Sequence, residues 1–259
     1  MEATRLTSTA NPAVRAMRAL EDARARRETD SMRLEGSKLC EEAARELEVE
    51  TLFVREGAQE RHADLIAACR AKGAAVYAVS DRVLDAVCAA KTPQDVVLSA
   101  RIPRMALRAG PLVALDGVQD PGNLGAIVRT ADAAGFGGVV LGAGCADPYA
   151  PKSIRATMGS LFRVPIERTG DLAGWLAAQR QAGRALLISA LDGEDFFDRK
   201  GLPADPILVI GSEGRGISPA VAACATHRYR LPMAGGAESL NAAVAAGIMI
   251  YDIYRAGRA

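Results

Sequence analysis

The chain has 259 residues, of which 49% are hydrophobic, and this is enough apolar material to fill the cores of two ordinary domains. Its 32 Lys and Arg are balanced by 31 Asp and Glu, which excludes a protein that attracts nucleic acid through its overall charge. Five scattered cysteines, a polar start and the absence of long apolar runs argue against a disulfide framework, a secretory signal and a membrane span. We therefore expect a cytoplasmic protein with reduced thiols, no metal and no membrane association.

The first hundred residues alternate between helical and extended patterns. Residues 1–8 are polar and are expected to be loose, and residues 101–110 are expected to form a linker. The predicted helices cover residues 11–28, 37–47, 61–70 and 81–88, with Asp81 as a cap, and the predicted strands cover residues 32–34, 51–54, 75–79 and 96–99. This alternation predicts a smaller N-terminal α/β domain over residues 1–105.

The helix predicted over residues 11–28 carries five arginines opposite its apolar stripe: Arg15, Arg18, Arg24, Arg26 and Arg27. They could contact RNA, or they could form a solvated face balanced by nearby acidic residues, and charge alone favours neither interpretation.

A second domain is predicted over residues 106–259. Its strands are expected over residues 112–115, 138–141, 163–165, 185–189 and 206–210, followed by a short helix and another strand. Asp120–Pro121 is a good helix start, because proline at the first helical position loses no needed N–H, and this helix is expected to end at Gly135. Further helices are predicted over residues 171–182 and from Ser239, at or near an N-cap, to about residue 254. The order predicts a mostly parallel sheet with helices on both faces.

Two glycine-rich stretches follow predicted strands, at Gly211–Ser218 and at Leu231–Asn241. Loops at the C-terminal ends of parallel strands form the crevice in which such sheets bind ligands. The first stretch has the glycine spacing of a phosphate-binding loop, but Ile217 stands in place of the lysine. A dinucleotide fingerprint fails because Val140 occupies the third glycine position, and GxSxG and HExxH motifs are absent. An early glycine-rich loop typical of Rossmann-type methyltransferases is also missing.

Three segments together resemble the motifs of the SpoU (TrmH-type) RNA ribose 2′-O-methyltransferases of the SPOUT superfamily. They are Asp120–Ala131, Ile210–Ser218, and Leu231–Met233 with Ser239–Ile248, and their order and spacing both fit. The resemblance covers about residues 110–257, with alanine at 242 and 243 where valine and serine are commoner. Residues 5–100 more loosely resemble the family's ribosomal-protein-like substrate-binding domain, through Ser8–Pro12, the Arg26–Arg27 pair and Glu35–Gly36.

The resemblance implies a deep C-terminal trefoil knot, an exception to the rule that chains do not thread. It also implies S-adenosylmethionine as cofactor, held largely by backbone groups, and a homodimer whose active sites are completed by the partner. The implied catalytic positions are Arg129, Asn123, Glu213, Ser239 and Asn241. The implied cofactor-binding positions are Gly211, Leu231, Leu240, Met233, Ile210 and Gly216.

Structural alternatives exist for several of these residues. Glu213 could simply cap a helix, Ser239 could be only an N-cap, and Asn241 could only tie its loop together. The resemblance implies methylation of a ribose 2′-hydroxyl, with 23S ribosomal RNA favoured over tRNA because simple tRNA-acting members of the family lack such an N-terminal domain. A non-catalytic RNA-binding or ribosome-assembly factor of the same fold is the alternative from another class. Antibiotic resistance conferred by the methylation is compatible with the sequence.

Overall fold

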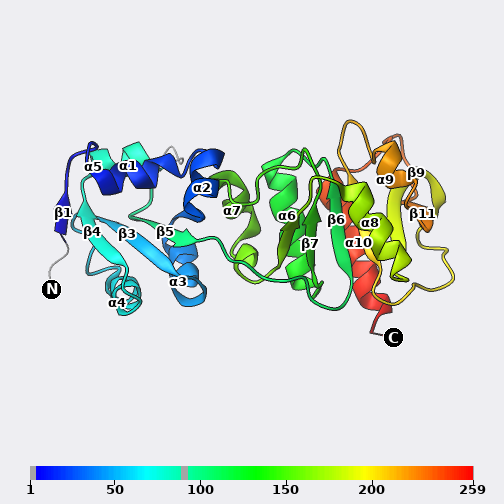
Figure 1. Ribbon diagram of the computed structural model, residues 1–259, viewed down its shortest axis with the longest axis horizontal. Helices are drawn as coiled ribbons and strands as arrows, with labels where there is room; N and C mark the ends of the chain where they lie inside the picture. Colours follow the sequence, from blue (N-terminus) through cyan, green and yellow to red (C-terminus); the bar gives the residue numbers. More distant parts are fainter. Residues whose placement is uncertain (1–3, 89–92, 259) are drawn as a thin grey trace. The chain divides into compact units, whose positions relative to one another are not determined.

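A computed structural model describes residues 4–88 and 93–258, which divide into two compact units. Unit 1 holds the chain up to Pro103 together with Asp147–Phe162, and unit 2 holds Arg104–Ala146 with the chain from Arg163 onward. Each unit has its own sheet, and Figure 1 labels most of their helices and strands. Among the helices of the described residues, none is long and apolar enough to cross a membrane.

Unit 2 is built on a six-stranded, wholly parallel sheet in the order β11-β9-β10-β6-β7-β8. Its strands are β6 (Leu112–Asp116), β7 (Gly138–Leu141), β8 (Ile166–Arg168), β9 (Leu186–Asp195), β10 (Ile207–Gly211) and β11 (His227–Arg230). Its helices are α6 (Pro121–Ala133), α8 (Leu172–Gln181), α9 (Pro219–Ala222) and α10 (Ala242–Ala256). The prediction of a parallel sheet in this half is confirmed.

The residues of the central strand β6 explain why helices cover both faces of this sheet. Successive side chains of a strand point to opposite faces. Val113 and Leu115 pack into a core cluster with residues of α6 and α10, whereas Leu112 and Ala114 pack into a second cluster with residues of α8 and α9. Helices therefore cover both faces, as predicted, and this leaves the C-terminal edge of the sheet to the loops.

Unit 1 is a smaller α/β unit around the five-stranded sheet β1-β4-β3-β5-β2. Its strands are β1 (Thr4–Leu6), β2 (Ser31–Glu35), β3 (Val49–Arg55), β4 (Ala75–Val79) and β5 (Val96–Arg101), with β5 antiparallel to both of its neighbours. Its helices are α1 (Pro12–Ala19), α2 (Ala23–Thr29), α3 (Ser37–Glu46), α4 (Ala63–Ala71), α5 (Asp81–Val87), α7 (Pro151–Thr157) and the 3₁₀ turn η1 (Ser160–Phe162).

Several predicted boundaries were wrong. The helix predicted over residues 11–28 is broken into α1 and α2, because the carboxylate of Asp22 accepts the backbone N–H groups of Arg24 and Ala25 and starts a second helix. Residues 4–6, expected to be loose, form β1 by pairing with β4. Ser80, and not Asp81, occupies the N-cap position of α5.

Two strands of unit 2 also differ from the prediction. The strand expected over residues 163–165 lies at Ile166–Arg168, where it pairs with β7. The strand expected to end at Ser189 continues to Asp195, because β11 pairs with it across a register shift. Residues 192–195 are Asp, Gly, Glu and Asp, which are depleted in strands, so this extension depends on pairing with another strand and not on local propensity.

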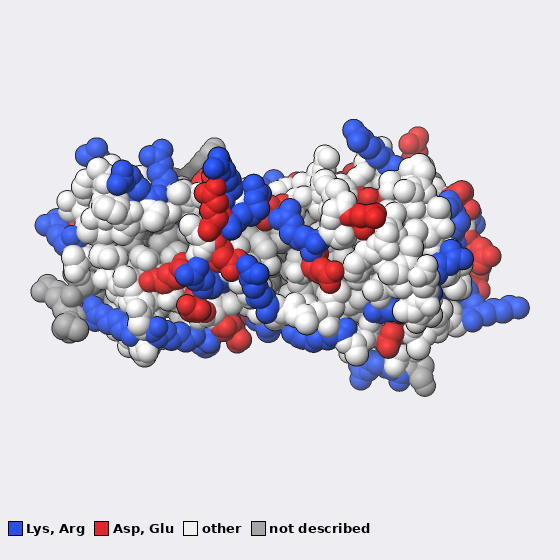
Figure 2. Space-filling model, in the orientation of Figure 1, with Lys and Arg blue, Asp and Glu red and all other residues white. Residues whose placement is uncertain are grey.

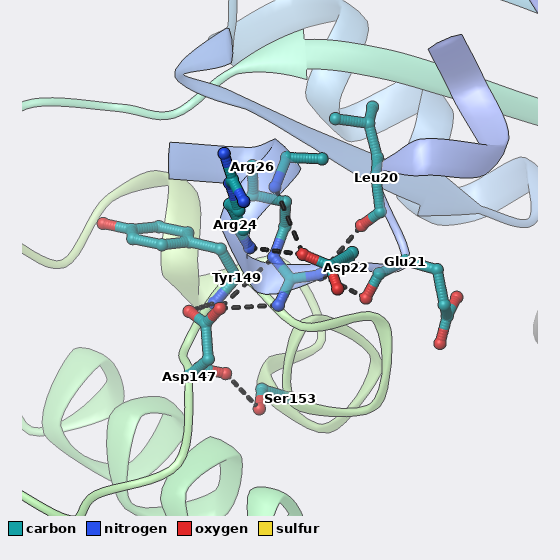
Figure 3. Close-up of polar contacts among 9 residues, drawn as sticks. Leu20, Glu21, Asp22, Arg24, Arg26, Asp147, Tyr149 and Ser153 are labelled. Carbon is teal, nitrogen blue, oxygen red and sulfur yellow. Dashed lines mark hydrogen bonds and ion pairs between the residues drawn. The ribbon is translucent and has the colours of Figure 1, made fainter. Parts of the chain in front are cut away.

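The segment Asp147–Phe162 leaves the sheet of unit 2 between β7 and β8 and belongs to unit 1. Figure 3 shows the guanidinium of Arg26, on α2, between Asp147 and the backbone of Leu20 and Glu21. Arg26 is 3% exposed, donates to the carbonyl oxygens of Leu20 (2.8 Å) and Glu21 (2.7 Å), and pairs with Oδ2 of Asp147 at 2.6 Å. Arg26 is thus satisfied inside the protein, so both interpretations of this arginine, the RNA contact and the solvated face, were wrong.

A second ion pair and a close approach hold the same segment. Arg155, on α7, lies 3.6 Å from the carboxylate of Glu35 at the end of β2. Gly159 has φ +88° and packs so closely on Glu42 of α3 that a Cβ would lie 2.2 Å from a carboxylate oxygen. These contacts make residues 147–162 an integral part of unit 1.

Candidate active site

The C-terminal edge of the unit 2 sheet holds a cavity of about 350 Å³. Its lining comes from the loop after β10, the loop after β11, the start of α10 and the middle of β9. All six positions predicted to bind the cofactor lie in this lining: Gly211, Leu231, Leu240, Met233, Ile210 and Gly216. Two of the predicted catalytic residues, Glu213 and Ser239, line it as well.

The loop after β10 is a tight turn that folds back on the end of its own strand. Ser212 and Gly216 exchange two backbone hydrogen bonds of 3.1 and 2.9 Å, and Gly216 has φ +65°. A Cβ on Gly211 would lie 2.3 Å from the carbonyl carbon of Gly216, so only glycine permits this approach. The carboxylate of Asp116, at the end of β6, accepts the backbone N–H of Ser218 at 2.7 Å and fixes the far end of the turn.

The loop after β11 offers its backbone to a ligand. Among the residues that the structure describes, no turn or loop hydrogen bond uses the backbone of residues 231–240. Backbone N–H and C=O groups are strong donors and acceptors, and they can bind the edge of a purine ring without any charged side chain. This loop and the glycine turn therefore suit a nucleoside that is held mainly through backbone groups.

Three side chains from three separate motifs form one hydrogen-bonded chain beside the cavity. The amide nitrogen of Asn123, in the first turn of α6, donates to Glu213, and the amide nitrogen of Asn241 donates to Oδ1 of Asn123 at 3.0 Å. Oδ1 of Asn241 in turn accepts the N–H groups of Ala243 (2.9 Å) and Val244 (3.2 Å).

The two ends of this chain fix the orientation of both amides. A carboxylate can only accept, so Asn123 must turn its nitrogen toward Glu213 and its oxygen toward Asn241. Backbone N–H groups can only donate, so Asn241 must turn its oxygen toward the helix and its nitrogen toward Asn123. Each middle position therefore needs a side chain that donates on one side and accepts on the other, as the asparagine amide does, and the chain joins the loops that bear the three motifs.

The structure corrects one boundary at this site. Asn241 caps the last helix, since its side chain accepts the N–H groups of the first turn of α10, whereas Ser239 lies two residues earlier in the loop. Ser239 therefore lies near the N-cap, as predicted, but the cap itself is Asn241. By contrast, Asp120 does cap α6, accepting the N–H of Asn123 at 2.8 Å, and this prediction is confirmed.

Arg129 lies apart from the other predicted catalytic residues. It follows Asn123 by six residues on α6, which corresponds to about 9 Å along the helix axis. Its side chain is exposed, is not part of the cavity lining, and makes no hydrogen bond or ion pair with the described residues. An exposed, unpaired guanidinium is available to a substrate or to a second subunit.

Several lining residues were not singled out from the sequence, among them Ser189, Ala190 and Leu191 on β9 together with Arg215 and Arg230. The rule that ligands bind at the C-terminal ends of parallel strands would have indicated the β9 residues, because a strand was predicted there. Within the described residues, no group of His, Cys, Asp and Glu side chains could hold a metal ion. On the face drawn in Figure 2, basic and acidic side chains are interspersed, in line with the balanced composition.

Comparison with known proteins identifies both halves of the chain. Residues 110–251 match the model of the SpoU rRNA methylase family, and residues 11–98 match an MRM3-like substrate binding domain. The chain is 31% identical, over 96% of its length and 98% of the relative, to the 23S rRNA (guanosine(2553)-2′-O)-methyltransferase RlmP of Bacillus subtilis.

Solved structures give the same result. A crystal structure of an AdoMet-bound rRNA methyltransferase from Sinorhizobium meliloti is similar, with a TM-score of 0.86, 36% identity and 98% of each chain covered. The SpoU methyltransferase AviRb from Streptomyces viridochromogenes, in complex with AdoMet, has a TM-score of 0.83 and 29% identity, with 95% of this chain and 97% of that chain covered.

Proposed function

The chain belongs to the SpoU rRNA methylase family, and from this premise we propose that it methylates a ribose 2′-hydroxyl in 23S ribosomal RNA. The observation that carries the proposal is the 350 Å³ cavity, whose lining holds all six predicted cofactor positions beside the Asn123–Glu213–Asn241 chain. The MRM3-like domain supports RNA as the substrate, and we place the protein in the cytoplasm, where ribosomal RNA is accessible to it.

S-adenosylmethionine supplies an activated methyl group on a sulfonium sulfur. Gly211 and the loop from Leu231 to Leu240 would hold the nucleoside part through backbone groups, since they line the cavity and the backbone of residues 231–240 makes no loop hydrogen bonds. Apolar side chains such as Met233 would cover the ring and exclude water. The trefoil knot that the family implies stays a prediction.

In our proposal Arg129 acts on the ribose. In the reaction a bond forms between the 2′-oxygen and the methyl carbon, the carbon–sulfur bond breaks, and the hydroxyl loses its proton. A guanidinium is always protonated in proteins and so cannot serve as the base. We infer that Arg129 donates hydrogen bonds to the 2′-oxygen as negative charge develops there and to the adjacent phosphate, which takes the proton. Asn123, Glu213, Ser239 and Asn241 would position the ribose and the loops around it.

A homodimer is part of the proposal. Val244, Ile248 and Tyr251 lie on α10 at helical spacing and are 51%, 36% and 49% exposed, so they form an apolar stripe on one face of the helix. Such a stripe suits packing against a second copy, and the partner's Arg129 or the chain's own would then complete each site. Sedimentation of Ile248→Glu checks this, because a buried charge in the interface should give monomers. An unchanged dimer would show that this stripe is not the interface.

The first test is calorimetry with S-adenosylmethionine and S-adenosylhomocysteine. Gly211→Ala should weaken binding at least about tenfold, because its Cβ would displace the turn at Gly216, whereas Gly170→Ala, outside the cavity lining, is the matched control with open space around its Cβ. Transfer of a labelled methyl group to 23S ribosomal RNA, followed by mapping of the 2′-O-methylated nucleotide, is the second step.

The alternatives give different results in these experiments. A tRNA methyltransferase would bind the cofactor and methylate tRNA instead of 23S RNA. A non-catalytic RNA-binding or ribosome-assembly factor would bind RNA but show no saturable cofactor binding, and that result would leave the fold correct and the enzymatic proposal wrong.

A further inference from the structure

We propose that Arg215 and Arg230 form a phosphate-binding pair at the cofactor cavity and hold the RNA backbone next to the target ribose. Both residues contribute to the cavity lining, one from the turn after β10 and the other from the last position of β11. The inference rests on the proposed RNA methyltransferase function and adds two residues that contact the substrate in the same site.

Both side chains start from a fixed backbone. The N–H of Arg215 donates to the hydroxyl of Ser212 at 3.2 Å, inside the turn that Ser212 and Gly216 close with two hydrogen bonds. The backbone of Arg230 lies opposite that of Asp195 in the β11–β9 strand pairing, and the carbonyl oxygen of Arg230 accepts the N–H of Phe196 at 3.0 Å. Because the backbone is already ordered, binding a ligand costs only the entropy of the two side chains.

Neither guanidinium has a partner in the part of the chain that the structure describes. Both side chains are exposed, and neither guanidinium makes a hydrogen bond or an ion pair with a described residue. Arg228, two residues before Arg230 on the same strand, differs, because it donates to both carboxylate oxygens of Asp192 at 2.8 and 2.9 Å. A guanidinium has five donors and no acceptor, so the two free ones call for an anion from outside the chain.

The charge of the cavity lining favours an RNA phosphate, and not the carboxylate of the cofactor, as the anion that the two arginines bind. Among the described residues that line the cavity, Glu213 is the one carboxylate, and it already accepts a hydrogen bond from Asn123. S-adenosylmethionine carries a sulfonium and an ammonium against one carboxylate, so an excess of positive side chains does not favour its binding. An RNA backbone carries one negative charge per phosphate, and arginine binds phosphate through two parallel hydrogen bonds.

The experiment uses the full chain and compares Arg215→Gln and Arg230→Gln with Arg228→Gln as the matched control. Binding to in vitro transcribed 23S ribosomal RNA is measured over a series of salt concentrations, and cofactor affinity is measured separately by calorimetry. Each cavity substitution should weaken RNA binding about tenfold and reduce the slope of log K against log salt by about 1, with cofactor affinity unchanged within twofold. The control should change neither quantity.

Lysine variants sharpen the test. Arg215→Lys and Arg230→Lys should keep the salt slope but raise the KM for RNA, because a point charge lacks the planar fork. Lost cofactor affinity with normal RNA binding would overturn the proposal and assign the pair to the carboxylate of the cofactor. RNA binding equal to that of the control would overturn it as well. Failure of the proposed function itself would appear separately, as absence of methyl transfer by the unmodified chain.

Discussion

Replacing Arg26 by methionine tests whether residues 147–162 are energetically part of unit 1. Arg26 is 3% exposed, and its guanidinium bonds to two carbonyl oxygens and to Asp147. Methionine fills much of the same volume but has no donors, so three oxygens lose a partner at once. The matched control is Arg24→Met on the same helix, which removes an ion pair to Glu28 with side chains that are 81% and 61% exposed.

The expected magnitudes differ severalfold. Breaking a buried ion pair by removing one partner costs roughly 3–5 kcal/mol, because it leaves a charge that is poorly solvated. The carboxylate of Asp147 is 19% exposed and has other contacts, so we expect about 3 kcal/mol, at the low end of that range. An exposed pair at i,i+4 contributes about 0.3–0.5 kcal/mol.

Hydrogen exchange followed by mass spectrometry resolves where the stability is lost. Peptides from α2, β2 and α7 should exchange faster in Arg26→Met, with an opening free energy lower by about 3 kcal/mol. Peptides around Trp175, in α8 of unit 2, should keep the protection of the unmodified chain, and its fluorescence gives an independent signal for that unit. A loss no larger than that of Arg24→Met would refute the reasoning. Equal loss of protection in both units would show that the segment does not belong to unit 1 alone.

Three further predictions concern the site and the last helix. Asn123→Asp places a carboxylate against Glu213, so methyl transfer should fall about tenfold or more and the melting temperature should drop. Adding Glu213→Gln to this variant should restore the melting temperature. If Asn123→Asp alone were as stable as the unmodified chain, the hydrogen-bond chain would be contradicted. Arg129→Lys should lower methyl transfer about tenfold with RNA binding unchanged, and near-full activity would exclude the assigned role of its planar fork. The pKa of Asp252 lies below its ordinary value, because hydrogen bonds and charges of two arginines outweigh the burial that acts to raise it. An aspartate whose pKa is lowered in the folded state stabilises the protein above about pH 4 and loses this effect as the pH falls through the folded pKa. Asp252→Asn should therefore be less stable than the unmodified chain at pH 7. Urea unfolding should show this difference in stability shrink from pH 5 to pH 2.

Sequence reasoning succeeded where the signal is local. The apolar run before Gly211 predicted β10, and the Asp120–Pro121 pair predicted the start of α6, because a cap and a proline act within one helical turn. The parallel sheet followed from the alternation of such elements. The break between α1 and α2 was missed, because the apolar spacing of Val14, Met17 and Leu20 continues up to it and the cap at Asp22 was not recognised.

The rest could not be predicted, because it depends on residues far apart in the sequence. The extension of β9 to Asp195 exists because β11 pairs with it. The buried state of Arg26 depends on an aspartate 121 residues later. The glycine requirement at 211 could be predicted from the family motif, but its cause, the approach of Gly216, is visible only in three dimensions.

The chain passes between its two units three times, after Pro103, after Ala146 and after Phe162. A protease that cuts once after Pro103 would therefore not release unit 1, since two peptide connections remain. A recombination event that exchanges only residues 1–103 would leave behind the segment around which the incoming unit must pack. The substrate-binding unit thus cannot be exchanged as one continuous segment. An engineered chimera that changes RNA specificity has to replace residues 147–162 together with the N-terminal part.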